Sequence, residues 1–95
     1  MVALDDLLKD IRWLIDNTNR VEDTTGFKHG LLTVCIEWWD RLQWRDEGYT
    51  CSYVYDEPYE SGHYILDATF GHSLQLPDAV HQSVEATKEL LGDKA

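Results

Sequence analysis

In residues 49–55, Tyr or Cys alternates strictly with Thr, Ser or Val, and this regularity constrains the fold more than any other feature of the chain. Because successive side chains of a β-strand point to opposite faces, every second residue here shares one face. These residues are Tyr49, Cys51, Tyr53 and Tyr55. Residues 63–70 alternate in the same way, and the acidic segment between them contains Pro58 and Gly62, which favour turns. The two segments predict an antiparallel β-hairpin with a long loop, whose tyrosine face must pack on helices to be stable.

Two segments have the spacing of an amphipathic helix. Residues 4–16 place apolar side chains at positions i, i+3, i+4 and i+7. These side chains are Leu4, Leu7, Leu8, Ile11, Leu14 and Ile15. Turn-prone residues 17–19 are expected to end this helix. A last helix is expected to begin at Pro77, whose fixed φ suits the first helical position, and to end at Gly92.

The segment 27–45 fits two patterns. Its β-branched residues Thr33, Val34 and Ile36 favour a strand. At about 100° per residue, however, its apolar side chains fall on one broad helical face. They are Phe27, Leu31, Leu32, Val34, Cys35, Trp38, Trp39 and Leu42. We expect a helix that Asp23, Thr24 or Thr25 would cap and Gly48 would stop, with Trp38 and Trp39 in the core; a strand over 31–39 is the alternative.

The expected element order is helix, helix, strand, strand, helix, which is an α+β fold. We predict a small single domain over residues 1–95, with two N-terminal helices, an antiparallel hairpin and a C-terminal helix. Residues 71–76 are a candidate for a third strand. A chain of 95 residues has room for one hydrophobic core, and 43% hydrophobic residues argue against disorder.

The charge balance restricts the partners of this chain. Eighteen acidic residues against eight basic ones give a formal net charge of −10. Such a field repels phosphate backbones and anionic lipids, so we expect neither direct nucleic-acid binding nor membrane binding. A basic partner protein is the natural counterpart, because complementary potentials speed encounter. The alternative is that the charge serves solubility alone.

The two cysteines, Cys35 and Cys51, are expected to be free thiols. They form no CxxC pair and have no zinc-like spacing. The sequence shows no signal segment and no run of about 18 apolar residues that could span a bilayer. These features favour a cytoplasmic location.

The hairpin tip is the leading candidate for partner binding. It combines carboxylates and tyrosines around a stiff proline, and such residues can pair with basic groups and anchor interfaces. The candidates are Tyr55, Asp56, Glu57, Tyr59 and Glu60. Trp13 and Trp44 join them, because both fall on polar sides of the expected helices. For these tryptophans an interface, a homo-oligomer contact and a second core layer all stay open.

Signals for catalysis and for metal binding are weak. Glu37 and Asp40 would lie one helical turn apart and could hold Mg²⁺ or Mn²⁺, with Glu85 and Glu89 as a facing pair; a solvated polar face is the competing interpretation. A second hypothesis brings His63, Asp67 and His72 together near the second strand. The chain has no HExxH, GxSxG or phosphate-binding loop. We therefore expect no catalytic residue, no metal and no cofactor.

These expectations together favour a non-enzymatic inhibitor or adaptor that covers a basic, nucleic-acid-binding surface of a partner protein. In size and charge, though without a shared motif, the chain is similar to small phage-encoded inhibitors of bacterial defence and to small immunity proteins. Its carboxylates would then mimic the phosphates of a nucleic acid. Two alternatives stay open: a metal-dependent nucleotide-processing enzyme built on Glu37 and Asp40, and an oligomer that sequesters a nucleotide.

Overall fold

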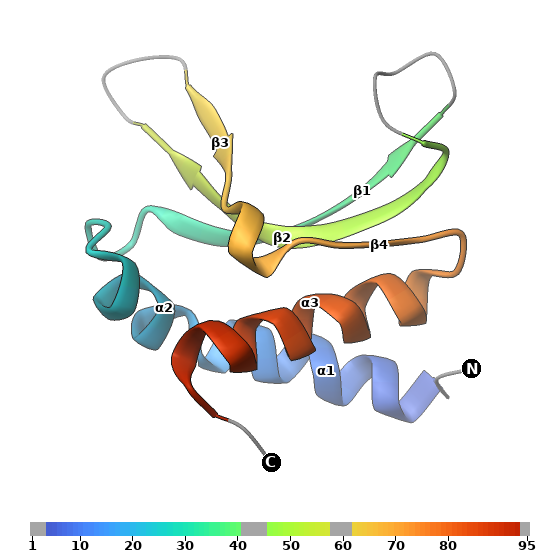
Figure 1. The fold of residues 1–95 in the computed structure, drawn as a ribbon, viewed down its shortest axis with the longest axis horizontal. Helices are drawn as coiled ribbons and strands as arrows, with labels where there is room; N and C mark the ends of the chain where they lie inside the picture. Colours follow the sequence, from blue (N-terminus) through green and yellow to red (C-terminus); the bar gives the residue numbers. More distant parts are fainter. Residues whose placement is uncertain (1–3, 41–45, 58–61, 94–95) are drawn as a thin grey trace.

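The computed structural model describes residues 4–40, 46–57 and 62–93, which form two layers. The elements, in chain order, are α1 (Leu4–Asp16), α2 (Thr18–Thr25), β1 (Leu32–Trp39), β2 (Gly48–Asp56), β3 (His63–Ile65), the 3₁₀ turn η1 (Asp67–Thr69), β4 (Gly71–Ser73) and α3 (Leu76–Leu91). An antiparallel sheet forms one layer, and α1 and α3 lie side by side beneath it (Figure 1). The α+β prediction is confirmed. Among the described residues, no helix is long and apolar enough to cross a lipid bilayer.

Strand β2 is the centre of the sheet. Strand β1 pairs with it over all eight β1 residues, from Leu32 opposite Tyr55 to Trp39 opposite Gly48. Its other edge is shared by β3, which pairs with residues 54–56, and by β4, which pairs with residues 49–51. The predicted hairpin is therefore confirmed, but its second strand is short. The turn η1 interrupts it, and the chain resumes as β4 within the segment predicted as a third strand.

The predicted helix over 27–45 is wrong, because residues 32–39 form strand β1. Almost every residue of this stretch is apolar or β-branched, so the helical template fitted without excluding a strand. The tyrosine face of β2 decides the outcome by offering partners across the pair, such as Tyr53 opposite Val34. Residues 41–45 lie outside the described residues.

The two tryptophans of β1 point to opposite faces as a consequence. Trp38 is 51% exposed and packs edge-on against Tyr49, with ring centroids 4.8 Å apart. Trp39 turns the other way and donates its indole N–H to Thr50 Oγ1 at 3.1 Å. The expectation that both lie in the core is therefore wrong for Trp38.

Helix α2 was not predicted. The turn-prone residues 17–19 do not end the helical path, since Asn17 N–H donates to the Trp13 carbonyl and Val21 N–H donates to the Asn17 carbonyl. The chain leaves the helix only at Gly26, whose φ of 80° is left-handed and suits glycine. Residues 23–25, expected to cap the start of a helix, are thus the end of one.

The core fills the space between the sheet and the helices. The β2 face with Cys51 and Tyr53 packs on buried side chains of α1 and α3. Those side chains are Leu7, Leu14, Val80 and Val84. Tyr53 is the largest fully buried side chain, and its hydroxyl donates to the Leu14 carbonyl. The predicted tyrosine-and-thiol face is therefore the one that meets the helices.

A buried carboxylate joins α2 to the start of β1. Glu22 is almost fully buried, and its Oε2 accepts hydrogen bonds from the backbone N–H groups of Gly30, at 2.6 Å, and Leu32, at 3.3 Å. Buried backbone donors need a partner, so this side chain stabilises the turn from which β1 departs.

We expect Glu22→Ala to lower the free energy of unfolding by about 2 kcal/mol, because two backbone donors lose their acceptor. Chemical denaturation measures the change. The matched control is Asp23→Ala, which removes an exposed carboxylate from the same helix and should change stability by no more than about 0.5 kcal/mol. Equal effects of the two variants would contradict a structural role for Glu22.

Candidate functional site

The concave face of the sheet, on the side away from the helices, carries a cluster of side chains that could react or bind a ligand. The sheet curves upward at both ends, away from α1 and α3 (Figure 1). Since Cys51 and Tyr53 face the helices, the alternating residues Ser52 and Val54 face the concave side. Both are nonetheless buried, so this face is not an open, fully solvated sheet surface.

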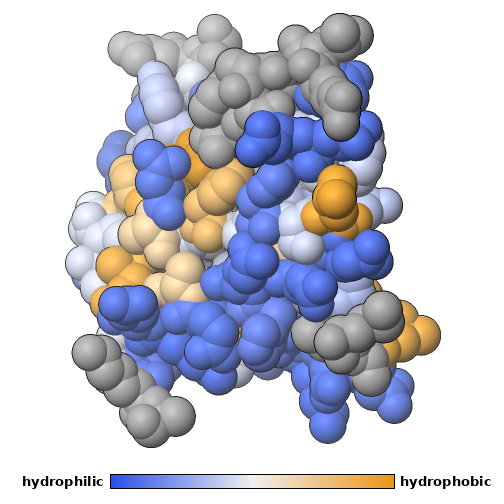
Figure 2. Space-filling model, turned by 45° about the vertical axis from the view of Figure 1, so that its right-hand side comes forward, coloured by the Kyte–Doolittle hydropathy of each residue, from blue (hydrophilic) through white to orange (hydrophobic). Residues whose placement is uncertain are grey.

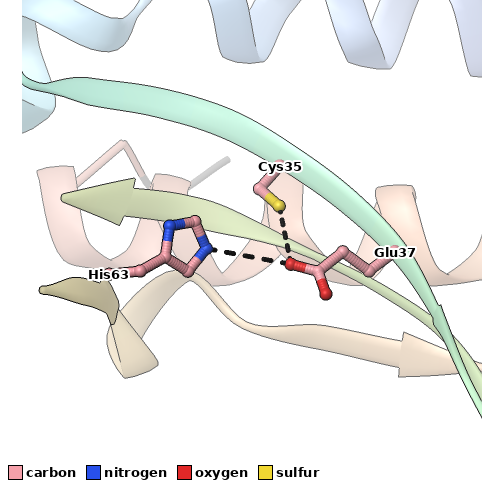
Figure 3. Close-up of side chains that lie close together, drawn as sticks. All are labelled: Cys35, Glu37 and His63. Atoms are coloured by element: carbon pink, nitrogen blue, oxygen red, sulfur yellow. Dashed lines mark hydrogen bonds and ion pairs between the residues drawn. The ribbon is translucent and has the colours of Figure 1, made fainter. Parts of the chain in front are cut away.

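Three side chains meet on this face: Cys35 and Glu37 from β1, and His63 from β3. The Cys35 thiol donates a hydrogen bond to Glu37 Oε1 at 3.0 Å. His63 reaches across β2, and its Nε2 lies 3.9 Å from the same oxygen (Figure 3). One potential ligand atom from each residue lies within 4.8 Å of the other two. We call this group the Cys35–Glu37–His63 cluster.

Asp56 fixes the orientation of the histidine in this cluster. His63 Nδ1 lies 2.7 Å from Asp56 Oδ1, and the two residues are register partners on β3 and β2. Because a carboxylate accepts hydrogen bonds, this contact places the hydrogen on Nδ1 and leaves Nε2 facing Glu37.

The thiol of Cys35 is held in its protonated form. Burial, together with the hydrogen bond to the Glu37 carboxylate, raises the pKa of Cys35 to about 12, and burial is the larger cause. A thiol in this state is a poor nucleophile at neutral pH, so the cluster does not resemble a cysteine-based catalytic site. Cys51, the other free cysteine, lies in the core, and burial raises its pKa to about 11.

The residues predicted at the hairpin tip are partly engaged within the protein. The Tyr55 ring stacks on Phe27 with centroids 4.6 Å apart, and its hydroxyl donates to Glu57 Oε2 at 3.2 Å. Asp56 contacts His63, as described above. Tyr59, Glu60 and Trp44 lie outside the described residues.

Trp13 lies in a second layer of the core. It is partly buried against the core cluster, and the ammonium group of Lys88 lies 5.6 Å from the ring centroid. Of the three roles left open for this residue, the second core layer is the one that its packing supports.

Both metal hypotheses from the sequence require correction. Glu37 and Asp40 are not one helical turn apart, because Glu37 lies on a strand and Asp40 follows its end. Likewise, His63 lies against Asp56 and Glu37, whereas His72 Nε2 lies 3.2 Å from the backbone carbonyl oxygens of Asp46 and Glu47, so the two histidines do not share a metal-ligand group. Among the described residues, Glu37 and His63 instead share a cluster with Cys35.

A sequence signal for the cluster did exist in the strand alternative for residues 31–39. On a strand, Cys35 and Glu37 are two residues apart and share a face, whereas on a helix they diverge. No pattern in the sequence indicated that His63 would lie beside Cys35 and Glu37.

No family model, no curated protein and no solved structure matches the chain. The chemistry of its own surfaces therefore carries the functional argument.

Acidic groups outnumber basic groups among the exposed side chains of the described residues. Within the described ranges, Lys and Arg form ion pairs with only three carboxylates: Arg12 with Asp16, Arg20 with Asp93, and Lys88 with Glu85. Exposed carboxylates outside these pairs lie on several elements. They include Asp5, Asp6, Asp46, Glu47, Asp67 and Glu89. In Figure 2, hydrophilic residues gather over the middle and lower part of the visible face, and a hydrophobic patch lies beside them on the left.

Proposed function

We propose that this protein is a non-enzymatic, acidic inhibitor or adaptor that binds a basic surface of a partner protein. The observation that carries the proposal is the large excess of exposed carboxylates over nearby Lys and Arg, together with a net charge of −10. A surface of this sign attracts a basic partner and disfavours nucleic acid and anionic membranes. It suits an anti-defence, antitoxin or immunity protein that covers a nucleic-acid-binding surface.

The β2–β3 end of the sheet is the proposed contact region. Here Asp56 is held by His63, and Glu57 is held by the Tyr55 hydroxyl. The Glu57 N–H also donates to the Gly62 carbonyl at 3.1 Å, which ties the ends of the loop together. Carboxylates that are already oriented lose less conformational entropy on binding, so they bind a partner's Arg or Lys more tightly.

Two free cysteines support a cytoplasmic setting, because oxidising compartments favour disulfides. We therefore propose that the partner is a cytoplasmic protein. Affinity capture from the native host, followed by mass spectrometry of proteins and small molecules, identifies it. A stoichiometric basic protein supports the proposal, whereas a copurifying nucleotide with no protein would favour the nucleotide-sequestering alternative.

We expect the variant Glu57→Gln/Tyr59→Ser/Glu60→Gln to bind the captured partner at least about 10-fold more weakly, equivalent to about 1.4 kcal/mol. Its unfolding midpoint should change little, since the introduced side chains are polar and Glu57→Gln keeps an oxygen that can accept from the Tyr55 hydroxyl. Calorimetric titration at two salt concentrations measures the affinity, and salt should weaken binding by the parent protein.

The matched control is Asp5→Asn/Asp6→Asn. It also removes two negative charges, but from the exposed start of α1. It should bind nearly as well as the parent. Equal losses in both variants would indicate a general charge effect. No loss in the tip variant at either salt concentration would contradict the proposed contact region.

A further inference from the structure

We propose that Cys35, Glu37 and His63 bind one zinc ion on the concave face of the sheet, and that Asp56 orients His63 for this role. Thiolate, imidazole and carboxylate together form a donor set that proteins use for zinc. Magnesium and calcium prefer sites made of oxygen ligands alone, so sulfur and nitrogen donors select against them. This inference does not need the partner proposed above, although Asp56 lies in both regions.

The spacing of the donor atoms fits a single ion. Ligand bonds of about 2.0–2.3 Å at a tetrahedral centre place neighbouring donor atoms about 3.3–3.8 Å apart. The cluster has 3.0 Å between Cys35 Sγ and Glu37 Oε1, and 3.9 Å between His63 Nε2 and the same oxygen. Small side-chain rotations therefore suffice to admit the ion.

The backbone holds the three ligands on one sheet. Cys35 and Glu37 lie two residues apart on a strand paired along its length, so their side chains project from the same face. His63 is paired opposite Asp56 on the far edge of β2. Ser52, the register partner of Cys35, lies on the same face between the two edges and has a small side chain.

Asp56 is the observation that separates this cluster from a chance meeting of polar groups. Histidines that bind zinc commonly donate their other ring N–H to a carboxylate, which fixes the tautomer and strengthens the donor nitrogen. The 2.7 Å contact between His63 Nδ1 and Asp56 Oδ1 has this arrangement, and Nε2 points into the cluster (Figure 3).

The charges also balance around a divalent cation. Three electron-rich atoms converge on this face, and the Cys35 thiol donates a hydrogen bond to Glu37 while His63 Nε2 stays 3.9 Å from the same oxygen. On binding, the Cys35 thiol releases its proton to solvent, and Zn²⁺ balances one thiolate and one carboxylate. Three protein ligands leave one tetrahedral position for water. Partial exposure of the Glu37 and His63 side chains gives the ion a route in.

Cobalt titration of the metal-free full-length chain tests the site. Co²⁺ replaces Zn²⁺ at tetrahedral sites and gives a sulfur-to-metal charge-transfer band when a thiolate is a ligand. We expect one Co²⁺ per chain with this band, displacement by Zn²⁺ and no displacement by Mg²⁺. Because the core lies on the opposite face of the sheet from the cluster, the metal-free protein should stay folded, and Zn²⁺ should raise its melting temperature.

Variants separate ligands from the supporting residue. Cys35→Ser should abolish the band, and His63→Gln and Glu37→Gln should each weaken Co²⁺ binding by more than about 100-fold, the upper end of the loss expected for an outer-shell partner. Asp56→Asn should keep the band and weaken binding by about 10–100-fold, because it changes only the orientation of His63. The controls Cys51→Ala and His72→Gln remove a thiol and an imidazole outside the cluster and should leave binding unchanged.

Circular dichroism establishes that each variant is folded before titration. Three results would overturn the proposal: no charge-transfer band in the folded parent, a band that persists in Cys35→Ser, or binding that is insensitive to both His63→Gln and Glu37→Gln. Should Cys35→Ser not fold, the other two ligand variants still decide the matter.

Discussion

Replacing Tyr53 with alanine is expected to lower the free energy of unfolding by about 3–5 kcal/mol, a large share of the stability of a small domain. Tyr53 is fully buried at the middle of β2, where α1, α3 and the sheet meet. Its removal leaves a cavity and takes away the hydroxyl that donates to the Leu14 carbonyl. Urea denaturation, with far-UV circular dichroism of the native state, measures the loss.

Two companion variants divide the effect into its causes. Tyr53→Phe keeps the ring and should cost about 1–2 kcal/mol, since only the hydrogen bond is lost. Tyr64→Ala truncates a tyrosine that is 53% exposed on β3, and should cost far less than Tyr53→Ala. A Tyr53→Ala variant no less stable than Tyr64→Ala would show that the tyrosine face of β2 is not the centre of the core.

Gly71→Ala is expected to destabilise the protein by about 3 kcal/mol or more, although it adds a single methyl group. An ideal Cβ at Gly71 would lie 2.1 Å from the Ala79 carbonyl oxygen and 2.7 Å from the Ser83 backbone nitrogen. Both are backbone atoms of α3 and cannot rotate aside, so β4 and α3 would have to separate. Ser83 Oγ also donates to the Thr69 carbonyl at 2.6 Å, a bond that such a shift would break.

Gly92→Ala is the matched control for this steric argument. Gly92 ends α3 with φ of 77°, and nothing lies within 4 Å of an added Cβ. Alanine there should cost about 1 kcal/mol through backbone strain alone. Gly71 has no positive φ, so its penalty comes from the close approach of β4 to α3. Similar melting temperatures for the two variants would contradict that explanation.

Where local periodicity was strong, the sequence was sufficient to predict the fold. The apolar spacing of α1, the Pro77 and Gly92 signals of α3, and the alternation of β2 each specify one structure without help from the rest of the chain. Strand β1 lacks such a signal because apolar residues occupy both of its faces, Leu32 and Val34 toward the helices and Trp39 away from them. Only pairing with β2 distinguishes strand from helix there.

The site depended on information that lies outside any one segment. Cys35 and Glu37 share a face only after residues 32–39 are known to be a strand. His63 joins them because the curved sheet brings β3 toward β1 across β2, and sheet curvature has no local sequence signature (Figure 1). The tip residues, by contrast, were selected from composition alone, and their role in binding stays a prediction.

The packing of α1 against α3 has a consequence for how the protein is made. The two helices contribute Leu7, Leu14, Val80 and Val84 to one core, so neither buries its apolar face alone. The intervening residues 17–75 take about 3–12 s to synthesise at about 5–20 residues per second. Until α3 has been made, α1 lacks the helix against which its leucines are buried, so these leucines are accessible to chaperones once α1 has left the ribosome. We therefore expect the core to be completed only when α3 becomes available.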